Sequence, residues 1–186
     1  MKRTLACCLA IALLLSLPAL SEATVFGQLE KRQLFSVRYD EKLLELDTEY
    51  FSDTSDEYTV WQFILYNDHV SIDCTIDIYD DDMSLFLMSE NEIDAYGQTL
   101  TDVFPGFSGK YTGIHYVRVS DGRREARLPF VTLRYSKKGE PDSFYAETVA
   151  HGVSIWFDCQ RMDSTLSDEE AQALLNALLD SFSPVL

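Results

Sequence analysis

Three histidines, His69, His115 and His151, are the residues of this sequence best suited to acid–base or metal chemistry. None belongs to a His-x-His or His-Glu-x-x-His pattern, so their spacing predicts no zinc site. The serines form neither a Gly-x-Ser-x-Gly nucleophile elbow nor a Ser-x-x-Lys motif. No glycine-rich loop is placed to hold a phosphate. The sequence therefore predicts no catalytic residue and no cofactor.

The chain is strongly acidic, with 31 Asp and Glu against 15 Lys and Arg and a formal net charge of −16. Because carboxylates are this common, no single pair of them indicates general acid–base catalysis. The charge repels phosphate backbones and anionic membranes, so it argues against nucleic acid and permits a cationic partner or divalent cations. One cluster offers oxygen ligands for Ca²⁺ without EF-hand spacing, and is either a calcium candidate or a solvated loop. It consists of Asp77, Asp80, Asp81 and Asp82.

Four arginines stand out against this acidic background, around an Asp121-Gly122 turn. They either dock an acidic partner or anionic ligand, or balance nearby carboxylates at a solvated hairpin tip. Trp156 is expected on the opposite face of its strand from Ile155 and Phe157, either under a second layer or in an exposed binding patch. The candidate partner patch is therefore Arg118, Arg123, Arg124, Arg127 and Trp156.

Residues 1–23 have the features of a secretory signal peptide. Lys2 and Arg3 precede an apolar run, and Ser21-Glu22-Ala23 is a small-x-small cleavage site. An uncleaved anchor and a lipoprotein are the alternatives. Cleavage leaves residues 24–33 as a polar lead-in and residues 34–186 as one domain, without a further transmembrane segment. We therefore expect a secreted, periplasmic or cell-envelope protein.

Cys74 and Cys159 are the cysteines that remain after this cleavage, and we predict that they form a disulfide. Export places them in an oxidising compartment. Each lies on the apolar face of an alternating segment, so both are expected to point inward. Inward cysteines on neighbouring strands are bridged when their Cα atoms come within about 7 Å. The alternative is two separate buried thiols.

The segments that must position these residues carry clear helix and strand signals. Ser89 and Ser167 each open a Ser-x-x-Glu capping box ahead of an apolar helical stripe. The first helix is expected to stop at Pro105-Gly106 and the second at Pro184. Alternating apolar residues predict strands over residues 70–78 and 149–159, and residues 34–39 are a further strand candidate. Residues 59–66 are apolar on both faces, which predicts a central strand, and residues 113–119 and 125–135 flank the Asp121-Gly122 hairpin signal. The stripe of the second helix is Ala171, Leu174, Leu175, Leu178 and Phe182.

The chain order itself suggests a family. The segment Leu34-Phe35-Ser36-Val37-Arg38-Tyr39-Asp40 follows the signal peptide, and a mid-chain helix and long hairpin strands come next. The last helix ends Leu178-Leu179-Asp180-Ser181-Phe182-Ser183-Pro184. This arrangement resembles the PsbP-like group, which includes extrinsic photosystem proteins, exported bacterial DcrB-type proteins and a Ran-binding import factor. The resemblance implies an α+β fold, an antiparallel sheet flanked by helices, and a non-enzymatic role in binding or assembly.

Three functional hypotheses follow from these features. The first is an exported, non-catalytic binding or accessory module for a protein or small ligand, since a well-patterned domain carries no catalytic motif. The second is a secreted hydrolase with a site outside the known motifs, using His115 or His151 with an acidic neighbour. The third is a Ca²⁺-responsive adhesion or sensing module centred on residues 77–82.

Overall fold

The computed structural model of the chain describes residues 22–29, 32–47, 51–54, 59–78, 89–100, 108–120, 125–136, 138–150 and 153–184. Two helices are described, α2 (Glu90–Leu100) and α3 (Asp168–Ser181). The strands are β1 (Glu22–Leu29), β2 (Arg32–Asp40), β3 (Glu45–Leu46), β4 (Phe51–Thr54), β5 (Thr59–Tyr66), β6 (Val70–Ile78), β7 (Ser108–Ser120), β8 (Glu125–Ser136), β9 (Ser143–Ala150), β10 (Val153–Arg161) and β11 (Ser183–Pro184).

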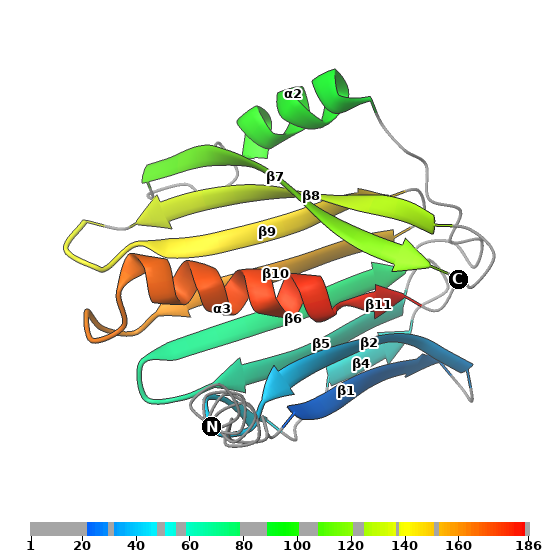
Figure 1. Ribbon diagram of the computed structural model, residues 1–186, viewed down its shortest axis with the longest axis horizontal. Helices are drawn as coiled ribbons and strands as arrows, with labels where there is room; N and C mark the ends of the chain where they lie inside the picture. Colours follow the sequence, from blue (N-terminus) through cyan, green and yellow to red (C-terminus); the bar gives the residue numbers. More distant parts are fainter. Residues whose placement is uncertain are drawn as a thin grey trace, which may run out of the picture.

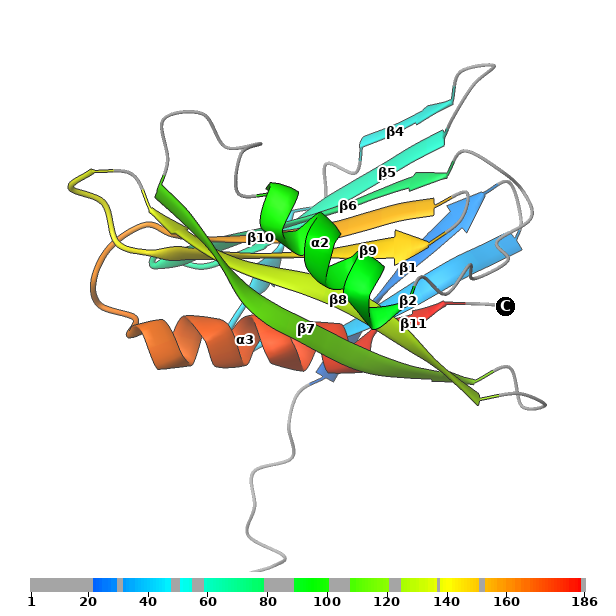
Figure 2. The same ribbon diagram turned by 90° about the horizontal axis from the view of Figure 1, so that it is seen from above.

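The described strands form two antiparallel sheets. The large sheet has the order β3-β5-β6-β10-β9-β8-β7, with β4 paired to β5, and the small sheet has the order β1-β2-β11. α3 and the small sheet lie together on one face of the large sheet. α2 lies on the opposite face and packs against β7 and β8 (Figures 1 and 2). The α+β class expected from the sequence is confirmed.

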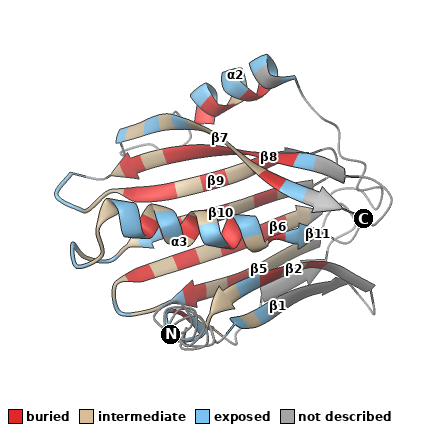
Figure 3. Cartoon of the chain, viewed as in Figure 1, coloured by how far each residue is buried: buried red, intermediate tan, exposed pale blue. Residues whose placement is uncertain are grey.

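The two faces of the large sheet are buried to different extents. The face under α3 holds the larger core, and buried positions recur along the strands beneath the helix (Figure 3). This core includes a set of packed phenylalanine rings. The ring of Phe182, directly after α3, has its centroid 6.0 Å from that of Phe35, 6.1 Å from Phe130 and 6.4 Å from Phe157. The opposite face is covered by α2 through a smaller cluster of Ile93, Leu100, Val131 and Leu133.

α3 begins with the predicted capping box. The Ser167 hydroxyl accepts from the Glu170 N–H at 3.2 Å, and the Glu170 carboxylate accepts from the Ser167 N–H at 2.8 Å. These hydrogen bonds lower the pKa of the Glu170 carboxyl. Most of the predicted stripe is buried, but Leu174 lies only half-buried at the edge of the helix. The helix ends at Ser181, because the chain then becomes extended and pairs with β2 as β11.

α2 also begins with its predicted capping box, and Gly97 inside it has a structural reason. The Ser89 N–H donates to the Glu92 carboxylate at 2.8 Å. A Cβ at Gly97 would lie 2.5 Å from the ring of Tyr111 on β7, so glycine lets the strand pack directly against the helix. The Tyr111 hydroxyl then donates to Asp94 at 2.6 Å. The expected end of this helix, after Leu100, lies outside the described residues.

One expectation about strands was wrong. Residues 149–159 are not one strand, because β9 and β10 form a hairpin in which Ala150 pairs with Val153. Within the predicted polar lead-in, residues 24–29 belong to β1, which pairs with β2 from Glu22 onward. The predicted cleavage after Ala23 would therefore remove the first two residues of a strand.

The predicted disulfide is not formed, because Cys74 and Cys159 are both free and buried. They lie on neighbouring strands, β6 and β10, but the register pairs Cys74 with Phe157 and Cys159 with Ile72. The two cysteines are therefore diagonal neighbours, about 7–8 Å apart, which exceeds the usual Cα separation of a disulfide. Burial raises the pKa of both thiols, so they act as small core hydrophobes.

Candidate functional site

A groove of about 430 Å³ lies between α3 and β2, and we call it the apolar groove. Its exposed surface is mainly hydrocarbon, and its volume is within the range of about 300–1,000 Å³ found for ligand sites. Leu174, Ala177 and Leu178 line it from α3. From β2 and the turn that follows, it is lined by Tyr39, Leu43 and Leu44.

Hydrogen bonds to backbone groups shape the two walls of the apolar groove. The Ser181 hydroxyl accepts from the Arg38 N–H at 3.0 Å and lies 2.9 Å from the Arg38 carbonyl. On the opposite wall, the Asp40 carbonyl accepts from the N–H groups of Leu43 and Leu44, both at 3.0 Å. This turn buries Leu44 in the core and leaves Leu43 52% exposed beside the groove. A large apolar side chain is therefore presented to solvent on a hydrogen-bonded turn.

The polar residues that line the apolar groove are mainly acidic. Glu22, Asp40 and Asp180 contribute carboxylates, and Arg38 contributes the single cation of the lining. Arg38 is 3.4 Å from Glu22, and both side chains are about half exposed. Solvent screens such a pair, so it contributes little to stability. The groove therefore combines an apolar surface with a net negative surround.

The three histidines do not converge. His115 Nε2 lies 2.9 Å from Asp180 Oδ1, so one histidine has the acidic neighbour that a base would need. The hydroxyls of Thr112 on the same strand and Thr132 on the neighbouring strand form other hydrogen bonds, since Thr132 donates to the Gly113 carbonyl and Thr112 to Thr132. His69 Nδ1 lies 2.9 Å from Asp163 Oδ2 at a distant turn, and His151 lies outside the described residues. The described histidines thus show no nucleophile–base contact.

The arginine and tryptophan candidates lie on different strands. Arg118 on β7 is directly opposite Arg127 on β8, and the Arg127 guanidinium lies 5.0 Å from the centroid of the Tyr116 ring. Trp156 is half-buried on β10, with β9 between it and β8, and it lies on the face away from α3. Arg123 and Arg124 lie outside the described residues. Docking of an anionic partner by these arginines stays a prediction.

The calcium candidate is only partly described. Asp77 lies near the end of β6, opposite Ser154 of β10, whereas Asp80, Asp81 and Asp82 lie outside the described residues. Within the described part of the chain, no group of three or more His, Cys, Asp or Glu side chains is arranged to hold a metal ion.

The face of the large sheet away from α3 carries two carboxylates that are held by tyrosines. Asp158 accepts from the Tyr135 hydroxyl at 2.5 Å, and burial raises the pKa of this carboxyl, with Asp73 adding to the effect. Glu147 accepts from the hydroxyls of Tyr96 and Tyr145, both at 2.8 Å. Burial also raises the pKa of the three tyrosines, so they remain protonated donors. These groups satisfy one another within the fold.

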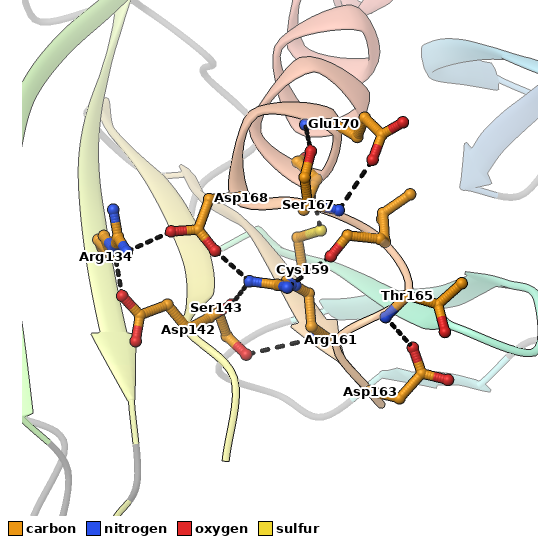
Figure 4. Close-up of polar contacts among 12 residues, drawn as sticks. Arg134, Asp142, Ser143, Cys159, Arg161, Asp163, Thr165, Ser167, Asp168 and Glu170 are labelled. Carbon is orange, nitrogen blue, oxygen red and sulfur yellow. Dashed lines mark hydrogen bonds and ion pairs between the residues drawn. The ribbon is translucent and has the colours of Figure 1, made fainter. Parts of the chain in front are cut away.

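An ion-pair network at the start of α3 was not predicted from the sequence (Figure 4). Asp168 pairs with both Arg134 of β8 and Arg161 of β10, and Arg134 also pairs with Asp142. The Arg161 side chain is only 6% exposed, so it depends on this carboxylate for compensation. The two arginines and the two aspartates of the network give no net charge. The network fixes the start of α3 on the sheet. Its partners are far apart in sequence, and no local spacing indicates them.

Comparisons with known proteins identify the fold. No protein-family profile and no curated protein sequence matches the chain. Among solved structures, it is similar to the solution structure of cyanobacterial PsbP (CyanoP) from Synechocystis sp. PCC 6803, with a TM-score of 0.50 and 15% identity. The alignment covers 91% of this chain and 95% of that one. The chain therefore has a PsbP-like fold, as the resemblance in the sequence predicted.

The helices were also compared with the requirements of a membrane span. Among the described residues, neither α2 nor α3 has the length and apolar character needed to cross a bilayer.

Proposed function

We propose that this chain is an exported, non-catalytic accessory module that holds a partner protein through the apolar groove. The observation that carries the proposal is the groove itself, an apolar surface of ligand-site size whose lining keeps the carboxylates of Asp40 and Asp180 when residues 1–23 are removed. The PsbP-like fold supports a role as an accessory or assembly factor, because the resemblance stated from the sequence implies binding and not catalysis.

The partner segment that fits this groove is amphipathic and cationic. Leu43 and Leu174 offer apolar surface to leucine-like side chains, which lose contact with water on binding. Asp40 and Asp180 flank that surface, and the whole chain carries a formal charge of −16. Lysine or arginine residues beside the apolar anchors would be attracted by this field, which raises the association rate and selects the partner.

A preformed groove favours binding because little ordering is needed when the partner arrives. α3 is held at its start by the pair of Asp168 with the buried Arg161 and at its end by Phe182 in the core. Ser181 then joins the helix to β2 through the backbone of Arg38. The groove walls are thus fixed by contacts that do not involve the partner.

Export is part of this proposal, with residues 1–23 as the signal peptide and the remainder as one domain. Processing after Ala23 would remove Glu22, which is the ion-pair partner of Arg38 in the groove. Mass spectrometry of the protein recovered from the secreted or envelope fraction tests this directly, since the mature chain should begin at Thr24. A chain that retains Glu22 in that fraction would contradict the processing site.

The binding proposal is tested with a synthetic amphipathic helix of leucine and lysine, titrated by calorimetry. We expect Leu174→Glu to raise the dissociation constant of this helix at least tenfold, which corresponds to a loss of about 1.4 kcal/mol in binding free energy. Leu43→Glu serves as a second variant, because an exposed side chain can be replaced without loss of folding. Met162→Glu is the matched control, since Met162 is 63% exposed and does not line the groove.

Two results would overturn the proposal. One is equal affinity of the parent and both groove variants for the leucine–lysine helix. The other is equal affinity of the parent for a leucine–glutamate helix, because that would remove the role of the acidic surround.

A further inference from the structure

A second groove lies on the other side of α3, where the helix faces β7, and we call it the polar groove. Its volume is about 340 Å³, and its exposed surface is mainly polar. Residues 112–115 of β7, Thr132 of β8, and Gln172 and Asn176 of α3 line it. It shares no lining residue with the apolar groove, so the two surfaces are separate.

The β7 side of the polar groove is shaped by a β-bulge. The register between β7 and β8 shifts between Tyr111 and Gly113, which leaves Thr112 as the extra residue. Gly113 has φ +132°, a conformation that other residues rarely adopt. The Thr132 hydroxyl donates to the Gly113 carbonyl at 2.9 Å, and the Thr112 hydroxyl lies 2.9 Å from the Thr132 carbonyl. The bulge is thus held open by its own hydrogen bonds.

The α3 side of the polar groove presents two amides with unused hydrogen-bonding capacity. Gln172 and Asn176 are four residues apart and therefore lie on the same face of the helix. Both are half-buried, yet among the described residues neither side-chain amide has a hydrogen-bond partner. His115, beside them, is held through Nε2 by Asp180, which leaves its second ring nitrogen for another contact. Half-buried polar groups of this kind are normally satisfied by water or a ligand.

We propose that the polar groove binds a neutral, hydroxyl-rich ligand of about the size of a sugar ring. Each amide offers a donor and an acceptor, which matches a hydroxyl group that both donates and accepts. The lining contains no arginine, lysine or carboxylate, and its histidine is already paired with a carboxylate outside the lining. The negative charge of the chain further disfavours anions. The volume is within the range of small-ligand sites.

The proposal is tested by titrating glucose and trehalose into the ¹⁵N-labelled protein and following backbone amide shifts. We expect saturable shifts at residues 112–115 and 172–176, with dissociation constants in the millimolar range. Asn176→Leu and Gln172→Leu keep the side-chain size and remove the amide, so each should weaken binding about fivefold or more, about 1 kcal/mol. Asn91→Leu is the matched control, because Asn91 is exposed on α2.

Three results would overturn the proposal. The first is the absence of saturable shifts in these residues with both sugars. The second is unchanged sugar affinity in both leucine variants, of which at least one must retain the parent melting curve. The third is binding of glucuronate, inorganic phosphate or spermidine at these residues when neither sugar binds. The leucine–lysine helix addresses the other groove, so failure of one proposal does not imply failure of the other.

Discussion

The two sides of α3 have similar hollows and opposite chemistry. Toward β2 the helix presents Leu174, Ala177 and Leu178 to a groove of about 430 Å³, and toward β7 it presents Gln172 and Asn176 to one of about 340 Å³. Between these sides, a buried stripe fixes the helix on the sheet. The buried stripe of this one amphipathic helix therefore packs into the core, and its two sides line two distinct grooves.

The strands that face the two flanks explain why both hollows exist. β2 belongs to the small sheet and approaches the helix closely where Ser181 bonds the backbone of Arg38. β7 is the outer strand of the large sheet, and its bulge at Gly113 displaces the chain opposite Asn176. The apolar groove follows from the approach of β2 and its following turn to α3, and the polar groove follows from an irregularity within the large sheet.

Loss of the aromatic contact at the end of α3 should disturb both sides at once and have the largest effect. Phe182 is 2% exposed, so Phe182→Ala leaves a cavity among Phe35, Phe130 and Phe157. We expect the free energy of unfolding in urea to fall by about 3–5 kcal/mol. Binding of the leucine–lysine helix and of glucose should weaken together. Met162→Ala, at a 63% exposed position, should change stability by about 0.5 kcal/mol or less.

The features that sequence predicts best are those with local signals. The capping boxes at Ser89 and Ser167 are formed as expected, because serine and glutamate three residues apart satisfy each other's backbone donors. Strands β5 and β6 have the predicted bounds, since the apolar run on both faces of residues 59–66 and the alternation along residues 70–78 are local signals. The disulfide failed for a different reason. It depended on cross-strand register, which alternation alone does not define to within two residues.

The candidate site was harder to predict because its parts come together only through the tertiary fold. The apolar groove joins Tyr39 to Leu178, and nothing near either residue in sequence indicates the other. Leu174 was assigned to the buried stripe, yet its place at the edge of that stripe makes it groove surface. Asn176 carries no signal at all, since a lone amide on a helix is ordinary. The bulge had one local clue, the glycine at position 113 within a strand pattern.

A change at the bulge should affect the polar groove and leave the apolar groove unchanged, because the bulge lines only the polar groove. In Gly113→Ala the new Cβ would meet no atom within 4 Å, so the penalty comes from backbone conformation alone. We expect a loss of about 1–3 kcal/mol in unfolding free energy and loss of the glucose-induced shifts. Affinity for the leucine–lysine helix should not change.

Gly139→Ala is the matched control for this variant. Gly139 also has positive φ, +91°, with open space at its Cβ position, but it lies in the turn before β9. It should lose similar stability and keep glucose binding. If both alanine variants lose glucose binding equally, the effect reflects general destabilisation, and the bulge has no special role.

The pH dependence of stability should come in part from Asp158, on the face of the large sheet away from α3. Burial raises the pKa of Asp158, so the folded state binds protons more tightly than the unfolded state, and the free energy of unfolding falls as pH rises through the interval between the two pKa values. Asp158→Asn removes this penalty and still accepts from the Tyr135 hydroxyl.

We therefore expect Asp158→Asn to melt above the parent at neutral pH, with the difference disappearing below about pH 4. Melting curves across this range give the measurement, and Glu169→Gln, at an exposed position on α3, is the control. Neither groove contains Asp158, so both ligands should bind as before. A parent that is more stable than the variant at neutral pH would contradict the assignment.

The smallest effect on stability is expected at Asp180, where the two sides of the helix meet. Its carboxylate lines the apolar groove and also holds His115 at the polar groove. The Asp180 side chain is 65% exposed, so Asp180→Asn should change the free energy of unfolding by about 0.5 kcal/mol or less. The asparagine carbonyl still accepts from His115, so glucose binding should persist. The lost charge should slow association of the leucine–lysine helix, and added salt should reduce the difference from the parent.

Asp180→Ala completes the test of whether the two sides act independently. Alanine removes the charge and the acceptor together, so it should weaken glucose binding as well, by releasing His115. If the asparagine and alanine variants lose glucose binding to the same extent, the charge of Asp180 affects binding in both grooves. The ligand of the polar groove is then not neutral. If neither variant changes the association rate of the leucine–lysine helix, the acidic surround does not select the partner, and the apolar surface alone determines binding.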